Sequence, residues 1–174
     1  MPRGLRMPID FFFRHLADDV EERAIAIIFS GMGTDGTLGL KAIKAKLGMV
    51  MVQSIESAKY DGMPKSAIET GMADYIAATQ DMPAKLTAYI KHLTTVPKEL
   101  ALAGRHTANA LQKIFVLLRA HTGYDFSFYK KNTICRRIER RMTVHQFTQI
   151  AKYVHYLQEN SQELTFLFKE LLIG

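Results

Sequence analysis

The residues of this chain best placed to do chemistry lie in the stretch from Ser30 to Gly36, SGMGTDG. Gly31, Gly33 and Gly36 match the G-x-G-x-x-G pattern in which backbone amides hold a pyrophosphate. Asp35 argues against that ligand, because its negative charge would lie where the phosphate binds. A carboxylate at the carboxyl end of a parallel strand could instead orient a histidine for a nucleophile. The remaining interpretation is a tight turn in which Asp35 caps the following helix.

A second candidate region is a run of cations that is opposed only by Glu139. It contains Lys130, Lys131, Arg136, Arg137, Arg140 and Arg141. On a helix, all of these except Lys131 share an arc that faces away from Ile134. Such a face repels itself without an acidic partner, so it predicts a binding surface, and the simpler alternative is a solvated helix face. The aromatic residues ahead of the run, Phe126, Phe128 and Tyr129, are expected to pack against the start of the helix.

The net charge of +6 lies entirely in the second half of the chain. Residues 1–100 carry 12 basic and 12 acidic side chains, whereas residues 101–174 carry 11 and 5. This asymmetry predicts an acidic partner, which could be nucleic acid, an anionic membrane or an acidic protein face. Aromatic side chains interleaved with the cations, which single strands need for stacking, are missing from the basic run. We therefore predict no nucleic-acid partner.

The elements that would position the glycine loop follow a βαβ rhythm. Short apolar runs predict buried parallel strands at 24–29, 49–52 and 74–78. Amphipathic stretches predict helices at 8–20, 40–47 and 83–93, with Asp10 as a candidate cap of the first. Residues 53–72 are expected to form a loop with one or two helical turns. We expect a partial parallel three-layer α/β sheet in residues 1–93.

The rest of the chain is predicted to be all-α. Residues 94–107 show weak periodicity and are expected to be a linker, and residues 108–174 carry four helical stripes. A small four-helix domain is therefore expected after the sheet. Asn160 with Glu163 resembles a capping pair at the start of the last helix. Cys135 is expected to be a small buried group without thiol reactivity.

Composition excludes several classes of protein. No apolar run approaches 18 residues, the start of the chain lacks a signal peptide's apolar core, and Cys135 has no intrachain partner. A cytoplasmic protein is expected. The histidines show no pair at i, i+4 and no cysteine near them, so no metal site is predicted.

Two segments of the first half together resemble a known family. IIFSGMGTDGTLGLKAI followed by MVMVQSIESAKYDGMPKSAIETGMADYI is similar to the C-terminal part of the chemotaxis protein-glutamate methylesterase domain. The matching positions are Gly31, Met32, Gly33, Asp35, Gly36 and Gly39, then Gln53, Ser57, Gly62, Met63, Pro64, Ala67 and Gly71. The resemblance implies hydrolysis of glutamate methyl esters on chemoreceptors, with Asp35 as the triad acid and Met32 beside the oxyanion. The family's serine and histidine have no matching position here, so we expect a part of that enzyme.

The second half resembles the N-terminal helical domain of the chemotaxis receptor methyltransferases. The resemblance rests on FVLLRAHTGYDFSFYKKNTICRRIERRM and the final LFKELLIG. It implies that the basic helix contacts the acidic receptor region, with Arg137, Arg140 and Arg141 as the best candidates and with Arg136, Lys130 and Lys131 beside them. It also implies that S-adenosyl-L-methionine binds a further, downstream domain, so we expect no cofactor in this chain.

Together the two resemblances predict a piece of a bifunctional methylesterase and methyltransferase of the two-component phosphorelay that controls chemotaxis. Its expected partner is the acidic cytoplasmic helices of a methyl-accepting chemoreceptor, with no nucleic acid and no membrane insertion. Receptor binding without turnover is expected of residues 1–174 alone. The alternatives are a non-enzymatic receptor-docking scaffold and, more distantly, a dinucleotide-binding enzyme.

Overall fold

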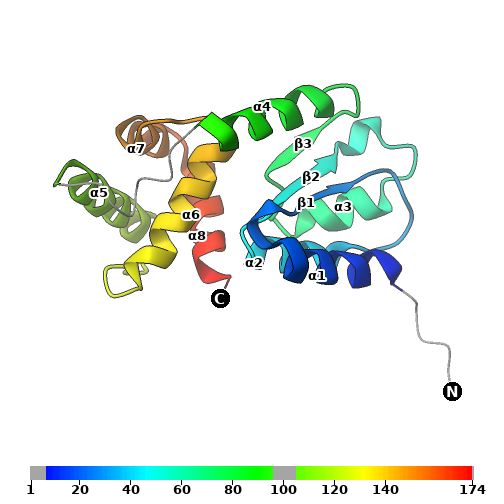
Figure 1. The fold of residues 1–174 in the computed structure, drawn as a ribbon, viewed down its shortest axis with the longest axis horizontal. Coiled ribbons are helices and arrows are strands. Elements are labelled where there is room, and N and C mark those ends of the chain that lie inside the picture. The colour runs from blue at the N-terminus through cyan, green and yellow to red at the C-terminus, as the bar shows by residue number, and fades with distance from the viewer. Residues whose placement is uncertain (1–6, 96–104, 174) are drawn as a thin grey trace, which may run out of the picture. The chain divides into compact units, whose positions relative to one another are not determined.

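The computed structural model describes residues 7–95 and 105–173 (Figure 1). Two compact units make up the chain, and the boundary between them falls between Lys85 and Leu86. That boundary lies inside helix α4 (Met82–Thr95). The domain limits expected at residues 93 and 108 stay predictions, since residues 96–104 of the expected linker lie outside the described residues. Helix α5 begins at Arg105, still within the segment that we expected to be linker.

The first unit is built on a three-stranded parallel sheet in the order β1-β2-β3. Short runs of Ile, Val and Met form these strands because β-branched and apolar side chains suit a sheet that is covered by helices. All five residues of the central strand are buried. The strands are β1 (Ile25–Ile28), β2 (Met49–Gln53) and β3 (Tyr75–Ala77).

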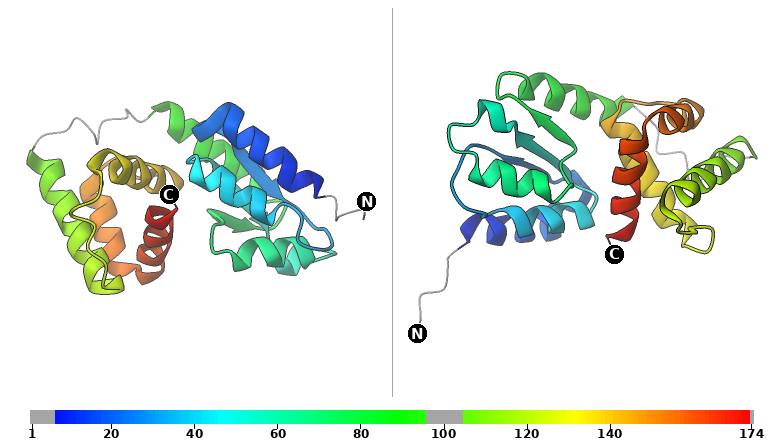
Figure 2. Two further views of the ribbon diagram at one scale, coloured as in Figure 1. Left: turned by 90° about the horizontal axis from the view of Figure 1, so that it is seen from below. Right: turned by 180° about the vertical axis from the view of Figure 1, so that it is seen from behind.

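Helices cover one face of this sheet. Ala26 and Ile28 of β1 and Val50 and Val52 of β2 point into one core, where they meet apolar side chains of α1, α2 and α3. Helices α1 and α2 pack against each other, as both views in Figure 2 show. Their bounds are α1 (Pro8–Val20), α2 (Thr37–Ala45) and α3 (Gly62–Glu69), with short 3₁₀ turns at η1 (Glu21–Arg23) and η2 (Ile55–Ser57).

The second unit is a helical cluster with its own core. Each helix contributes its apolar stripe, and Ile114, Leu118, Ile138, Leu157 and Leu167 are fully buried at the centre. The helices are α5 (Arg105–Thr122), α6 (Lys131–Val144), α7 (Ile150–Glu159) and α8 (Ser161–Leu172). The fold class predicted from the sequence, a partial parallel α/β sheet followed by a four-helix domain, is confirmed.

Two predictions of local structure were wrong. Met7, not Asp10, occupies the N-cap position of α1, because that helix already begins at Pro8. The side chains of Asn160 and Glu163 do not form the expected capping pair, because the Asn160 amide donates to the carbonyl oxygen of Tyr156 and the buried Glu163 carboxylate is bonded to Arg141. Among the described residues, no helix is long and apolar enough to cross a membrane.

Candidate functional site

Asp35 lies in the loop that follows β1, and its carboxylate is fixed by the start of another helix. Its Oδ2 accepts the N–H of Ile9 at 3.1 Å and its Oδ1 accepts the N–H of Asp10 at 2.9 Å. These are first-turn amides of α1, which no intrahelical acceptor can satisfy. Asp35 therefore caps α1, and the prediction that it caps the following helix was wrong: the N-cap of α2 is Gly36, which makes no side-chain cap bond.

The capping is reciprocal. Asp10 sits in the first turn of α1, and its Oδ1 accepts the N–H of Gly39 at the start of α2, at 2.6 Å. The two carboxylates differ in access to solvent, because Asp10 is only 3% exposed whereas Asp35 is partly exposed. Within the residues that the structure describes, each Asp35 oxygen accepts a single hydrogen bond and keeps a further lone pair. Asp35 can therefore accept the N–H of an imidazole while α1 holds it in place.

Two glycines of this loop, Gly31 and Gly36, have no room for a side chain. Gly36 has a positive φ of 95°, and a Cβ there would lie 2.8 Å from Cδ1 of Ile28. A Cβ on Gly31 would overlap the sulfur of Met63. The three glycines predicted as structural lie in one loop, which follows the carboxyl end of β1. Met32 belongs to the same loop, and 79% of its surface is exposed.

The second motif of the sequence, which begins at Gln53, holds this loop in place through hydrogen bonds. The Gln53 side chain accepts the N–H of Ser30 at 2.8 Å and donates to the carbonyl oxygen of Ser57 at 2.9 Å. The Ser30 hydroxyl accepts the N–H of Tyr60, and Tyr60 in turn accepts the N–H of Gly31. Two motifs that are separate in the sequence thus form one structure, which explains why they occur together.

The same geometry argues against a dinucleotide. A pyrophosphate would bind the first-turn amides of α2, but Asp10 already accepts the N–H of Gly39 there. A second anion at this position would be repelled by that carboxylate.

The basic run is less exposed than its helical arc indicated. Lys130, Lys131 and Arg136 are exposed. The three residues that we ranked first as receptor contacts are largely buried, with exposed fractions of 5% for Arg137, 7% for Arg140 and 3% for Arg141. The expectation of one continuous solvent-facing arc was therefore wrong. The receptor-binding role of these residues stays a prediction.

Arg141 is the centre of a buried charge network that the sequence analysis missed. It donates to both carboxylate oxygens of Glu163, with a distance of 2.8 Å from Nε to Oε1, and it lies 3.4 Å from Glu170. Tyr153 donates to Glu163 at 2.8 Å, and His145 lies 2.8 Å from its other oxygen. The signal was present, because Glu163 and Glu170 fall on the apolar stripe of the last helix, where a carboxylate needs a buried partner.

This network sets the ionisation of Glu163. Burial by itself raises the pKa of that carboxyl, but hydrogen bonds from His145 and Arg141, together with the charge of Arg141, outweigh it and lower the pKa to about 2. The carboxylate is therefore ionised at neutral pH, as a partner of Arg141 has to be. Arg141 in this structure stabilises the fold of the helical unit.

Cys135 is buried, and desolvation raises the pKa of its thiol. A buried thiol of raised pKa carries little of the reactive thiolate at neutral pH. The prediction of an inert, buried cysteine agrees with this placement. No group of three or more His, Cys, Asp or Glu side chains in the described part of the chain could hold a metal ion.

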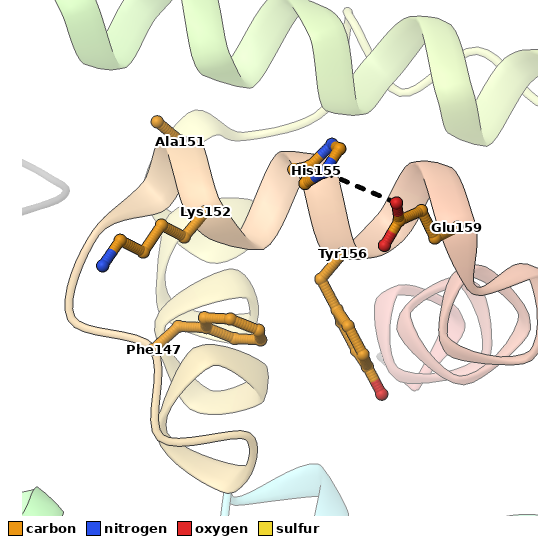
Figure 3. Close-up of a pocket in the computed structure, with 6 residues that line it drawn as sticks. All are labelled: Phe147, Ala151, Lys152, His155, Tyr156 and Glu159. Carbon is orange, nitrogen blue, oxygen red and sulfur yellow. Dashed lines mark ion pairs between the residues drawn. The ribbon is translucent and has the colours of Figure 1, made fainter.

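A hollow of about 480 Å³ lies on the helical unit, beside α7 (Figure 3). His155 and Glu159 form an exposed ion pair at its edge, with 3.4 Å between nitrogen and oxygen. Serine and cysteine are absent from its lining, so it offers no nucleophile to that histidine. None of the residues predicted as functional belongs to its lining, which consists of Phe147, Ala151, Lys152, His155, Tyr156 and Glu159.

Comparison with known proteins matches the two units to two families. Residues 2–86 match the CheB methylesterase family, and residues 109–172 match the all-alpha domain of the CheR methyltransferase family. The resemblance inferred from the sequence is confirmed, in the same order along the chain.

Two curated proteins and one solved structure are similar to this chain or to parts of it. A protein of Rhodobacter capsulatus, named "Uncharacterized 104.1 kDa protein in hypE 3'region", is 33% identical over 98% of this chain and 20% of its own length. The protein-glutamate methylesterase/protein-glutamine glutaminase of Thermotoga maritima is 39% identical over 48% of this chain and 24% of its own length. The chain thus spans about a fifth to a quarter of these relatives. The crystal structure of the Thermotoga maritima CheB methylesterase catalytic domain shares 40% identity over 44% of this chain and 41% of that one, with a TM-score of 0.43.

Proposed function

We propose that this chain, which joins a CheB methylesterase segment to a CheR all-alpha segment, is part of a chemotaxis-type protein that removes and adds methyl groups on chemoreceptor glutamates. The observation that carries the esterase half is the placement of Asp35. It lies at the carboxyl end of β1, partly exposed, with its carboxylate fixed by two backbone N–H groups of α1. That arrangement suits the acid of a Ser-His-Asp triad.

In this proposal, Asp35 holds the histidine in the correct tautomer and stabilises the imidazolium that forms when the serine attacks the ester carbonyl. The serine and the histidine come from a segment other than residues 1–174. The α1 amides keep the carboxylate oriented, so that it need not reorganise during the reaction. The exposed Met32 lines the site from the tip of the same loop.

The test is an Asp35→Asn substitution in the longest natural form of the protein that contains this chain. Asparagine keeps an oxygen acceptor for the cap but cannot select the tautomer of the histidine, so the kcat for methanol release from methylated receptor should fall by about ten-thousandfold. Asp61→Asn, which changes an exposed aspartate of the same unit, should leave the rate unchanged. An Asp35→Asn rate near that of the wild type would exclude the triad role.

We also propose that the exposed cations at the start of α6 dock an acidic helical segment of the receptor. Arg136, Lys130 and Lys131 are accessible, and they lie in the half of the chain that holds the whole charge excess. Long-range attraction between opposite charges steers such encounters and weakens with salt. Arg137 and Arg140 lie on the same helix but are largely buried, and the charge of Arg141 is matched by Glu163 and Glu170.

This docking proposal is tested with a fluorescently labelled acidic receptor helix and chain 1–174. Arg136→Glu should weaken binding by about tenfold at low salt, because it replaces attraction with repulsion, and raising the salt should weaken wild-type binding. Arg14→Glu, on the exposed face of α1, is the matched control and should have no effect. An affinity that changes neither with salt nor with Arg136→Glu would contradict the proposal.

The non-enzymatic scaffold differs from this proposal in a measurable way. A scaffold would bind the receptor helix with the same salt dependence, but the longest natural form would release no methanol from methylated receptor. Hydrolysis that disappears on Asp35→Asn would exclude the scaffold, whereas binding without any hydrolysis in the wild type would favour it.

A further inference from the structure

The loop between α5 and α6 presents to solvent an aromatic side chain that we expected to pack against the start of the basic helix. Phe128 is 92% exposed, more than any other large hydrophobic residue that the structure describes. Tyr124 and Tyr129, on either side of it, are 58% and 51% exposed. Only Phe126 packs as expected, with 1% of its surface exposed.

The exposure of Phe128 follows from an ordered turn. Phe126 anchors the loop in the core, with its ring 6.0 Å from that of Phe168 and 5.0 Å from that of Tyr129. Two turn bonds fix the backbone, one from the Ser127 N–H to the Asp125 side chain at 2.9 Å and one from the Tyr129 N–H to the Phe126 carbonyl at 3.0 Å. With Phe126 directed inward, the turn leaves the Phe128 ring outside.

Positive charge flanks this ring. Lys130 and Lys131 are exposed, and neither pairs with a carboxylate among the residues that the structure describes. The acidic residue of the loop, Asp125, is paired with Arg119 at 3.3 Å. The tip therefore combines an apolar ring, two amphipathic tyrosines and two uncompensated cations.

We propose that this loop, residues 124–131, binds an anionic lipid surface, with Phe128 entering the boundary between headgroups and acyl chains. Lys130 and Lys131 contact the lipid phosphates, and Tyr124 and Tyr129 lie at the headgroup level, where aromatic rings with a polar end are enriched. Lysines near an anionic leaflet are attracted strongly enough to support such a contact. The chemistry goes beyond the proposed receptor modification, because the ligand is lipid.

The shape of the loop favours lipid over a protein groove. Phe128 is 92% exposed, and Tyr124 and Tyr129 beside it are 58% and 51% exposed, so the loop carries three accessible aromatic rings next to two exposed lysines. An exposed ring buries more of its apolar area in a lipid layer, which can surround it, than against a flat protein surface.

The first test exploits the absence of tryptophan from the chain. Phe128→Trp in chain 1–174 places the only tryptophan of the variant in this loop, and its emission is excited selectively at wavelengths that tyrosine does not absorb. Vesicles of phosphatidylcholine mixed with phosphatidylglycerol should shift its emission to shorter wavelength, and this shift should shrink as salt is raised. Vesicles of phosphatidylcholine alone should produce no shift. Emission that does not change with the anionic vesicles would overturn the proposal.

The second test measures the affinity for the same anionic vesicles by co-sedimentation. Phe128→Ser should lower the partition coefficient by about tenfold, because the apolar area of the ring no longer leaves water. Lys130→Gln with Lys131→Gln should lower it by about tenfold or more at low salt. Val116→Ser, on an exposed apolar position of α5, and Lys152→Gln with Lys169→Gln are the matched controls and should bind like the wild type.

Two outcomes would assign the loop to another partner and contradict the lipid proposal. In one, the vesicles do not bind and Phe128→Ser weakens binding of the acidic receptor helix. In the other, the vesicles do not bind and Phe128→Ser weakens binding of a single-stranded oligonucleotide. The receptor assay contains no lipid and the vesicle assay contains no receptor, so failure of one proposal is distinguishable from failure of the other.

Discussion

The two units differ in the groups that pair with their central charged residues. Asp35 accepts backbone N–H groups, remains partly exposed and keeps lone pairs for a further donor. Arg141 pairs with the buried carboxylates of Glu163 and Glu170, and Tyr153 donates a hydrogen bond to Glu163. The first arrangement leaves a charge oriented and accessible, whereas the second uses the charge within the fold. A charged residue in a motif is therefore available for function only if its partners leave part of it open.

The largest effect should come from breaking the Arg141 network. Arg141→Met removes the guanidinium that pairs with the buried carboxylates of Glu163 and Glu170, which should cost about 3–5 kcal/mol of unfolding free energy. Urea unfolding followed by circular dichroism measures this loss. Arg136→Met, at an exposed position of the same helix, should change the free energy by no more than about 0.5 kcal/mol. Equal losses of unfolding free energy in the two variants would contradict the claim that the buried cation stabilises the fold more than the exposed one.

Acid should weaken the same network. The folded-state pKa of Glu163 is lowered from 4.5 to about 2, so its contribution is fully present above pH 4.5 and is lost as the pH falls toward 2. The loss amounts to about 3 kcal/mol across that window. Urea unfolding at stepped pH values measures it, with the exposed Glu159→Gln variant as control. A free energy that stays constant from pH 4.5 to 2 would show that Glu163 is not held as an ion.

Removing the cap from α1 should cost less. Asp35→Ala leaves the first-turn amides of Ile9 and Asp10 without their acceptor, which should lower the unfolding free energy by about 1–2 kcal/mol. Thr34→Ala, at the exposed neighbouring position, should stay within about 0.5 kcal/mol of the wild type. Thermal unfolding of the two variants side by side provides the measurement. No difference between them would mean that Asp35 does not cap α1 in solution.

The smallest effect belongs to an exposed pair on the first unit. Lys46 lies 3.2 Å from Asp18, but their side chains are 42% and 75% exposed. Water screens such a pair, so Lys46→Ala should change the unfolding free energy by no more than about 0.5 kcal/mol. A loss of more than 2 kcal/mol in the same urea assay would show that exposure does not separate weak pairs from strong ones here.

Much of the fold could be predicted from the sequence because it depends on local patterns. The apolar runs at β1 and β2 and the stripes of α5–α8 carry their own periodicity. The glycine motif and the Gln53 motif also marked the loop after β1 correctly, since both are local. Residues 62–69, expected as one or two helical turns, form α3.

What failed depends on contacts between distant segments. Asp35 and Ile9 are 26 positions apart, so no local rule tells that a loop carboxylate caps an earlier helix. The arc of basic residues on α6 could be predicted from helical geometry. Which part of that arc would be covered by α8 could not be predicted. Arg141 is buried because Glu163 and Glu170 lie opposite it. Phe126 and Phe128 look alike in sequence, and only the geometry of the turn decides which of them is exposed.

The most direct test of the account compares the two aspartates that cap each other's helices. Asp10→Asn and Asp35→Asn are made in the longest natural form containing this chain, and the rate of methanol release from methylated receptor is measured per folded molecule. The account predicts that Asp10→Asn keeps a rate near that of the wild type, because Asp10 is buried and only caps α2. Asp35→Asn should lose about ten-thousandfold. Equal rates in the two variants would contradict the claim that Asp35 does more than hold a helix.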